Sequence, residues 1–195
     1  MRKFLLISVL LVLVWSGVAP HDRFTWFMEV APVLIGLPIV ALTARRFPLT
    51  PLAYTLLAVH ACILMLGGKY TYAEVPLGHW VSQLMGWTRN NYDRLGHLAQ
   101  GFVPAIVGRE ILLRTSPLRP GKWLTFILIA ICLGISASYE LIEWGTALAT
   151  GSAADAFLGT QGDPWDTQED MAMAGVGAVL ALLTLRRVQD RQLER

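Results

Sequence analysis

Long apolar runs separated by short polar segments dominate the hydrophobic pattern of this chain. A helix needs about 20 apolar residues to cross the hydrocarbon of a bilayer, with a lower limit near 17. Six runs come close to this length, and the first and last are the shortest. We therefore predict six transmembrane helices, at residues 4–19, 24–43, 51–67, 92–113, 123–144 and 170–185. Residues 1–195 would then form a single all-α polytopic membrane domain.

The composition agrees with this pattern. Of the 195 residues, 54% are hydrophobic and only 15% are charged, which is typical of membrane proteins. The net charge of +2 and the lack of a dense Lys/Arg tract exclude nucleic acid as a partner. The expected partner is the lipid bilayer, and a homo-oligomer remains an option.

The first apolar run also resembles a secretory signal. Arg2 and Lys3 precede its leucine-rich part, and the small residues Gly17 and Ala19 follow. Pro20 directly after Ala19 would hinder cleavage at that point. We therefore predict that the run is retained as a span.

Basic residues indicate the direction of the spans. With the N-terminus in the cytoplasm, 12 of the 16 Lys and Arg residues fall in cytoplasmic segments and 4 in outer segments. Because cytoplasmic loops carry the excess of positive charge, this distribution predicts that both termini are cytoplasmic.

The outer segment between the third and fourth spans predicts a short interfacial helix. Pro76 suits the first helical turn, where its missing N–H is not needed. One face of the following helix would carry Leu77, Trp80, Val81, Leu84 and Trp87. Such an aromatic face favours anchoring at the membrane surface, with a lid over a site as the alternative.

Polar residues gather at the predicted outer ends of the fourth and fifth spans. Asp93 and His97 are four residues apart and share a helix face, and Gln100 follows on the same face. Glu140 and Glu143, three residues apart, share a face near the end of the fifth span. Carboxylates inside a membrane are costly, so their presence indicates a function.

The segment before the sixth span adds acids and amides on the same side of the membrane. Gly159, Gly162 and Pro164 predict a tight turn there, and Gly175 and Gly177 give the sixth span a small-residue surface for close packing, which we expect against the fifth span. The polar side chains of this segment are Gln161, Asp163, Asp166, Gln168 and Asp170.

These groups suggest a site with oxygen and imidazole ligands. Such ligands suit a divalent metal, namely Mg²⁺, Mn²⁺, Fe²⁺ or Zn²⁺. The predicted metal ligands, or acid and base groups, are His97, Glu140, Asp166 and Asp170. The predicted substrate-orienting or supporting residues are Asp93, Arg94, Gln100, Glu143, Gln161, Asp163 and Gln168. Without a metal, crowded carboxylates would keep one acid protonated, with His97 as a base.

Structural alternatives apply to several of these residues. Asp166 or Thr167 would favour the start of the sixth helix as a cap. Glu143 would reach back to the membrane surface, and Arg94 would pair with a neighbouring acid. Arg109, Glu110 and Arg114 form a predicted ion-pair group at the cytoplasmic end.

Four motifs of the chain closely resemble the YjdF-like family of bacterial inner-membrane proteins, which carry a domain of unknown function. The motifs are KYTYAEVP at 69–76, NYDRLGH at 91–97, SYELIEW at 138–144 and FLGTQGDPWDTQ at 157–168. The resemblance covers nearly the whole chain, and the last motif is highly specific. A weaker similarity is to VanZ-like membrane proteins, which also place a Glu-Trp element before an Asp-rich helix start. The resemblance implies a polytopic inner-membrane protein and supplies no reaction.

Three functions fit these observations. The first hypothesis is a metal-assisted enzyme that acts on a lipid or an envelope molecule at the outer leaflet. The second is a small transporter or ion-coupled protein, which would need polar residues that continue toward the cytoplasm. The third is a structural or accessory membrane protein whose polar groups satisfy one another.

Overall fold

The computed structural model describes residues 2–151 and 155–194, and this part of the chain contains helices and no strand. The long helices are α1 (Arg2–Gly17), α2 (Arg23–Thr43), α3 (Pro51–Tyr70), α5 (Tyr92–Thr115), α6 (Lys122–Thr150) and α8 (Asp166–Leu193). The short ones are η1 (Tyr72–Glu74), α4 (Pro76–Met85) and α7 (Asp155–Leu158). A long helix lies at each of the six predicted runs, whereas α7 was not predicted.

Four of these helices are long and apolar enough to cross a membrane. They are α2, α3, α6 and α8, while α1 is a shorter apolar helix. Helix α5 is 24 residues long but carries charged residues at both ends, which lowers its hydropathy. Its middle is nevertheless covered by neighbouring helices, because Val103, Ala105 and Ile106 are buried.

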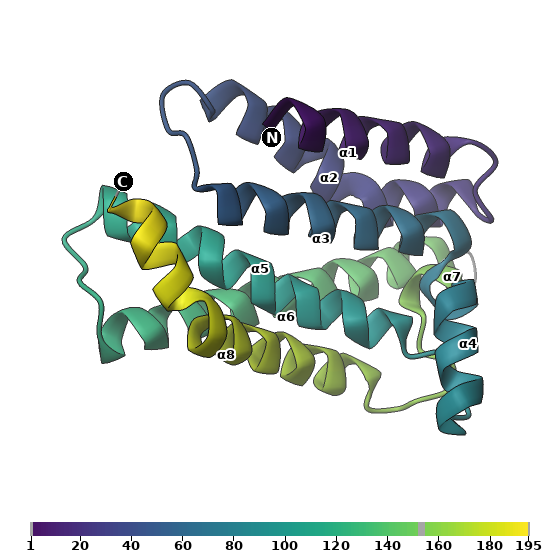
Figure 1. Ribbon diagram of the computed structural model, residues 1–195. Helices are drawn as coiled ribbons and strands as arrows, with labels where there is room; N and C mark the ends of the chain where they lie inside the picture. Colours follow the sequence, from purple (N-terminus) through teal and green to yellow (C-terminus); the bar gives the residue numbers. More distant parts are fainter. Residues whose placement is uncertain (1, 152–154, 195) are drawn as a thin grey trace.

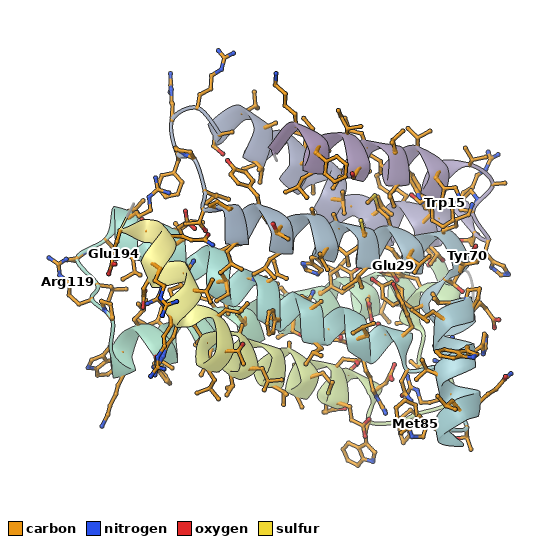
Figure 2. All side chains as sticks on the ribbon, viewed as in Figure 1. Trp15, Glu29, Tyr70, Met85, Arg119 and Glu194 are labelled. Atoms are coloured by element: carbon orange, nitrogen blue, oxygen red, sulfur yellow. The ribbon has the colours of Figure 1, made fainter. Side chains whose placement is uncertain are left out.

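The long helices run alongside one another as two groups of three (Figure 1). Helices α1 and α2 pack against α3, helices α6 and α8 pack with α5, and α3 and α5 join the groups. The view with side chains places Tyr70 and Met85 at one end of the molecule and Arg119 and Glu194 at the other (Figure 2). We call the first of these the α4 end and the second the basic end.

Helix α1 is held by side chains of the neighbouring helices. Val9 lies in an apolar cluster with Val30, Val33 and Met65. The indole N–H of Trp26 donates to Ser16 Oγ at 3.1 Å. These contacts make α1 part of the first helix group.

Helices α5 and α8 approach each other closely through small residues. A Cβ added to Gly101 would overlap the carbonyl oxygen of Ala174, and one added to Gly177 would overlap that of Leu98. The predicted small-residue surface of the last span is thereby confirmed. Helix α6, the predicted fifth span, also contacts α8, but these glycines place the backbone of α8 against that of α5.

Hydrogen bonds and ion pairs of Glu110 and Arg109, two buried residues of α5, connect helices at the basic end. Glu110 accepts hydrogen bonds from the N–H of Thr50 at 2.9 Å and from its hydroxyl at 2.7 Å, and pairs with Arg114 at 2.9 Å. The predicted pair of Glu110 and Arg114 is confirmed, whereas Arg109 pairs instead with Asp190 at 2.7 Å. These bonds link α5, the start of α3 and the end of α8.

Helix α4 lies across the other end of the bundle (Figure 1). It begins at Pro76, as predicted, and Leu77, Trp80 and Leu84 are exposed on it. Asn90 holds its start, because the amide of Asn90 donates to the carbonyls of Ala73 and Val75 at 2.9 and 3.0 Å. This segment therefore has a fixed position beside the first turn of α5.

Candidate metal site

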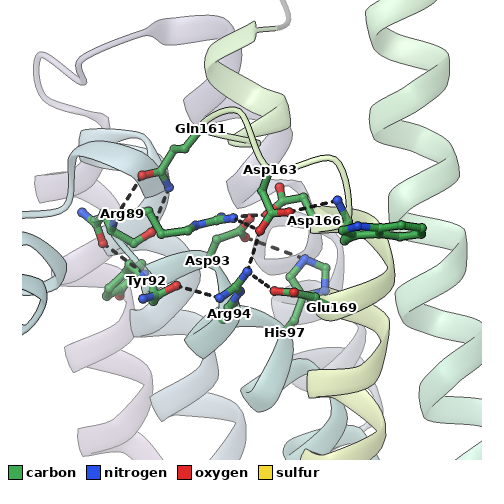
Figure 3. Close-up of polar contacts among 12 residues, drawn as sticks. Arg89, Tyr92, Asp93, Arg94, His97, Gln161, Asp163, Asp166 and Glu169 are labelled. Atoms are coloured by element: carbon green, nitrogen blue, oxygen red, sulfur yellow. Dashed lines mark hydrogen bonds and ion pairs between the residues drawn. The ribbon is translucent and has the colours of Figure 1, made fainter. Parts of the chain in front are cut away.

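Polar residues of α5, of the segment before it and of the first turn of α8 contact one another (Figure 3), and His97 of α5 also contacts Glu140 of α6. An outer group consists of Arg89, Arg94, Asp163, Asp166 and Glu169, and an inner group consists of Glu29, Asp93, His97, Glu140, Glu143 and Asp170. The two groups differ in charge balance, since the outer group contains both arginines and the inner group contains only acids and one histidine.

Ion pairs hold the outer group together. Arg89 contacts Asp163 at 3.0 Å and Asp166 at 2.7 Å. Arg94 contacts Asp163 at 2.9 Å and also pairs with Glu169. Burial acts to lower the pKa of Arg89, but its hydrogen bond and ion pair with Asp166 raise that pKa overall, so the guanidinium stays charged. The alternative that Arg94 pairs with a nearby acid is confirmed.

The turn before α8 is fixed by two side chains. Asp163 Oδ1 accepts the N–H of Trp165 at 2.9 Å, and this bond, together with the charges of Arg89 and Arg94, lowers the pKa of Asp163. Gln161 bonds to both the N–H and the carbonyl of Asn90, at 3.0 and 2.8 Å. These contacts dock the predicted tight turn onto the start of α5.

His97 lies at the centre of the inner group. Its Nε2 is 3.4 Å from Glu140 Oε1 and 3.7 Å from Asp93 Oδ1, and its Nδ1 is 3.2 Å from Ser136 Oγ. The side chains of His97 and Glu140 are buried. Residues from α5 and α6 that are far apart in sequence are therefore in direct contact.

Asp170 completes a group with the spacing of metal ligands. One ligand atom each from Asp93, His97 and Asp170 lies within 4.8 Å of the others. Asp170 is only 2% exposed, and its Oδ1 has no hydrogen-bond partner among the described residues. A buried carboxylate oxygen without a donor is costly unless a cation or a proton occupies the space beside it.

Glu29 belongs to the same site but was missed in the sequence. It is 4% exposed, and its Oε2 accepts a hydrogen bond from the hydroxyl of Tyr139 at 3.0 Å. The charges of Asp93 and Glu143 act near it. The signal that could have identified Glu29 is a single carboxylate inside the otherwise apolar run 24–43. Arg89 was also missed. Its signal is that it is one of the few basic residues on the predicted outer side.

The remaining predicted residues lie in different surroundings. Gln100 is next to His97, with its Oε1 buried and without a hydrogen-bond partner in the described chain. Gln168 is exposed. The capping alternative for Asp166 is wrong, because α8 starts at Asp166 and no side chain caps it. The surface-reaching alternative for Glu143 is also wrong, because its side chain is buried beside the other inner acids.

This arrangement can bind a cation. The outer acids form ion pairs with Arg89 and Arg94, whereas among the described residues the basic group within 4.0 Å of the inner acids is the imidazole of His97, beside Asp93 and Glu140. Carboxylate oxygens and an imidazole nitrogen are ligands for Mg²⁺, Mn²⁺, Fe²⁺ and Zn²⁺. The fold and this site define a helical integral membrane protein with a buried acid–histidine cluster at one end of its helix bundle.

Comparisons with known proteins agree with this class. Residues 1–191 match the family model described as "Predicted membrane protein (DUF2238)". The chain is 53% identical, over 189 residues, to "Inner membrane protein YjdF" of Escherichia coli (strain K12), covering 97% of this chain and 90% of the relative. No solved structure matches. The chain therefore belongs to the DUF2238 family, as the motifs predicted, and it is a multi-pass inner-membrane protein.

Proposed function

We propose that this protein holds a divalent metal ion between Asp93, His97 and Asp170 and uses it to act on a lipid or an envelope molecule. The observation that carries the proposal is the side chain of Asp170: its buried Oδ1 has no hydrogen-bond partner among the described residues, and a carboxylate oxygen of this side chain lies within 4.8 Å of ligand atoms from Asp93 and His97. Ser136 supports the same proposal, because its contact with Nδ1 orients the ring so that Nε2 of His97 points toward Asp93 and Glu140.

The neighbouring residues would assist the metal. A bound divalent ion would polarise a phosphoryl or carbonyl oxygen, or activate a water molecule. Glu140, at 3.4 Å from His97 Nε2, is placed either to complete the ligand set or to exchange a proton with substrate. Asp166 is held by Arg89 and would orient the site from its outer side. These are the roles of a metal-assisted hydrolase or transferase.

The proposed orientation has six spans, with both termini in the cytoplasm. It is supported by the basic residues at the end opposite α4, such as Arg109, Arg114 and Arg186, and by the exposed aromatic residues of α4. In this orientation α4 lies in the outer membrane–water interface. The metal site then faces the outer leaflet, where a lipid headgroup would reach it.

Transport is the second candidate, and the packing argues against it. The acids do extend from Asp170 to Glu29 across several helices. Between them and the basic end, however, lies a buried apolar cluster that contains Ile106, Leu128 and Leu182. Within the described part of the chain, this packing offers no polar route for an ion through that half of the bundle. A purely structural role is the third candidate. It suits the outer group, in which acids and arginines pair with one another, better than the inner group.

Elemental analysis of the purified full chain tests the metal site. We expect about one divalent ion per chain after incubation with Mn²⁺ or Zn²⁺, and its loss in Asp170→Asn and His97→Gln. The matched control is Glu169→Gln, which removes the same charge one residue away at a side chain that pairs with Arg94. A native chain that stays free of metal, or equal loss in the control, would contradict the site.

A second experiment tests the enzyme. The native chain and Asp170→Asn would be incubated with Mn²⁺ in vesicles of a bacterial polar-lipid extract, followed by mass spectrometry of the lipids. We expect a product that appears only with the native chain. A metal-loaded native chain that leaves the lipids unchanged would contradict action on lipids and leave the metal site standing.

A further inference from the structure

A small cavity lies at the basic end of the bundle, among α5, α6 and α8. Its volume is about 120 Å³, which is less than half of the roughly 250 Å³ of the apolar groove in the first helix group. Its polar side chains are Arg109, Thr125 and Arg186, and its walls include Leu124, Leu128 and Leu183. The cavity is separate from the metal site, which is at the other end of α5.

Two guanidinium groups give this cavity a positive rim. Arg109 is 4% exposed and uses Nη1 and Nη2 to bond Gln189 at 3.0 Å and Asp190 at 2.7 Å, which leaves further donors on the same group. Arg186 is exposed and has no hydrogen bond or ion pair within residues 2–151 and 155–194. Asp190 offsets the charge of Arg109, so Arg186 supplies the unbalanced positive charge.

The start of α6 adds to the positive character of the rim. Gly121, which lines the cavity, is the residue before this helix, and no side chain caps the helix. The first N–H groups of a helix favour an anion, because they lack partners inside the helix. An anion at this position would therefore meet donors from both arginines and the backbone.

The apolar walls indicate the rest of the ligand. Beside the cavity, Trp123 and Phe126 expose large apolar surfaces on α6, a helix able to cross the membrane. A drug-sized ligand needs a pocket of about 300–1,000 Å³, so this cavity admits only a small group. A phosphate with hydrocarbon attached fits both features, since the phosphate would enter the cavity and the chains would lie along α6.

We propose that this cavity binds the phosphate group of an anionic phospholipid from the leaflet at the basic end. Basic pockets between membrane helices on the cytoplasmic side are suited to anionic headgroups. Arg186 would contact the phosphate directly, and Arg109 would do so while it keeps its bonds to Gln189 and Asp190. This site is independent of the proposed metal chemistry.

Native mass spectrometry of the purified full chain tests this proposal with phosphatidylglycerol, phosphatidylcholine of the same chain length and inorganic phosphate as probes. We expect phosphatidylglycerol to remain bound and Arg186→Gln to weaken its affinity about fivefold, as expected for one basic residue near an anionic headgroup. Arg187→Gln is the matched control, because it removes the same charge from the next residue, which does not line the cavity. The affinity of Arg187→Gln for phosphatidylglycerol should stay within about twofold of that of the native chain.

A second variant tests the cavity itself without a change of charge. Leu183→Trp should fill the space beside Arg186 and reduce phosphatidylglycerol binding while both arginines remain. Equal binding of phosphatidylcholine, displacement of the lipid by an equal concentration of inorganic phosphate, equal weakening in Arg187→Gln, or unchanged binding in Leu183→Trp would each overturn the proposal.

Discussion

The hydroxyl of Tyr139 in α6 donates a hydrogen bond to Glu29 in α2, with 3.0 Å between Tyr139 Oη and Glu29 Oε2. The bond connects the two helix groups next to the inner acids. The ring of Tyr139 is fixed by edge contacts with the rings of His97 and Phe157, at centroid distances of 6.3 and 6.2 Å. Glu29 is therefore linked to His97 through one side chain.

Removal of this hydroxyl should destabilise the protein. Tyr139→Phe leaves the buried carboxylate of Glu29 with one donor fewer, and a buried acceptor that loses its partner costs about 1–3 kcal/mol. We expect a lower thermal midpoint, measured by tryptophan fluorescence of the detergent-purified chain.

A double-mutant cycle with Glu29→Gln provides the control for this bond. The two changes should be non-additive, because they remove the same interaction. Tyr70→Phe alters a tyrosine whose ring packs against Trp15 and should have a smaller effect. Additive effects of the two changes at positions 29 and 139 would show that the bond contributes nothing.

Asp170→Asn should stabilise the protein in the absence of metal. Asp170 is buried near the charges of Asp93, Asp166 and Glu140, and its Oδ1 has no donor in the described chain. A neutral side chain of the same shape removes this repulsion and burial cost, for which we expect a gain of about 1–2 kcal/mol. The measurement is thermal unfolding after treatment with a chelator.

When metal is present, the native chain should become more stable than Asp170→Asn. At a metal concentration about 100 times the dissociation constant, the native chain should gain about 2.7 kcal/mol, and Asp170→Asn should gain much less. If metal stabilises both proteins equally, or if the chelated variant unfolds first, Asp170 is a structural residue and not a ligand.

The positions of the long helices and the convergence of the polar residues could both be predicted from the sequence. Helix positions follow from the lengths of the apolar runs. His97 and Glu140 are in contact because Asp93/His97 and Glu140/Glu143 each share a helix face at the same end of neighbouring helices. Periodicity and span direction were sufficient for this result.

The contribution of α2 and the pairing of the acids could not be predicted in the same way. Helix α2 is distant in sequence, and its position beside α6 depends on tertiary packing around Tyr139. Asp166 forms its ion pair with Arg89 because of the path of the turn before α8. That turn is held in place by the hydrogen bond between Gln161 and Asn90. Such side-chain pairings depend on the shape of a loop, and the hydrophobic pattern of the sequence does not determine that shape.

Substitution of Gly101 should disrupt the contact between α5 and α8. A Cβ at this position overlaps the backbone of Ala174, which cannot move without displacing α8. We therefore expect Gly101→Ala to cost about 1–3 kcal/mol, in spite of the higher helix propensity of alanine.

Gly134→Ala in α6 is the matched control, because an added Cβ there meets nothing within 4 Å. Alanine should be neutral or stabilise this helix by up to about 1 kcal/mol. Thermal unfolding of the two variants compares them directly. A similar midpoint for both would contradict the close approach of α5 and α8.

Acid should remove the stabilisation that Asp163 provides. Its pKa is lowered by the N–H of Trp165 and by the charges of Arg89 and Arg94, so its contribution is complete above the pKa of an unfolded Asp, about 3.9, and is lost as the pH falls through the lower folded value. Asp163→Asn should therefore lower the thermal midpoint by a constant amount between pH 7 and pH 5, and this difference should shrink below about pH 4. Glu194→Gln, an exposed acid at the basic end, is the control and should have little effect across the same range. A difference that persists unchanged to pH 2, or one that grows as acid is added, would mean that the ionised carboxylate of Asp163 does not hold the turn.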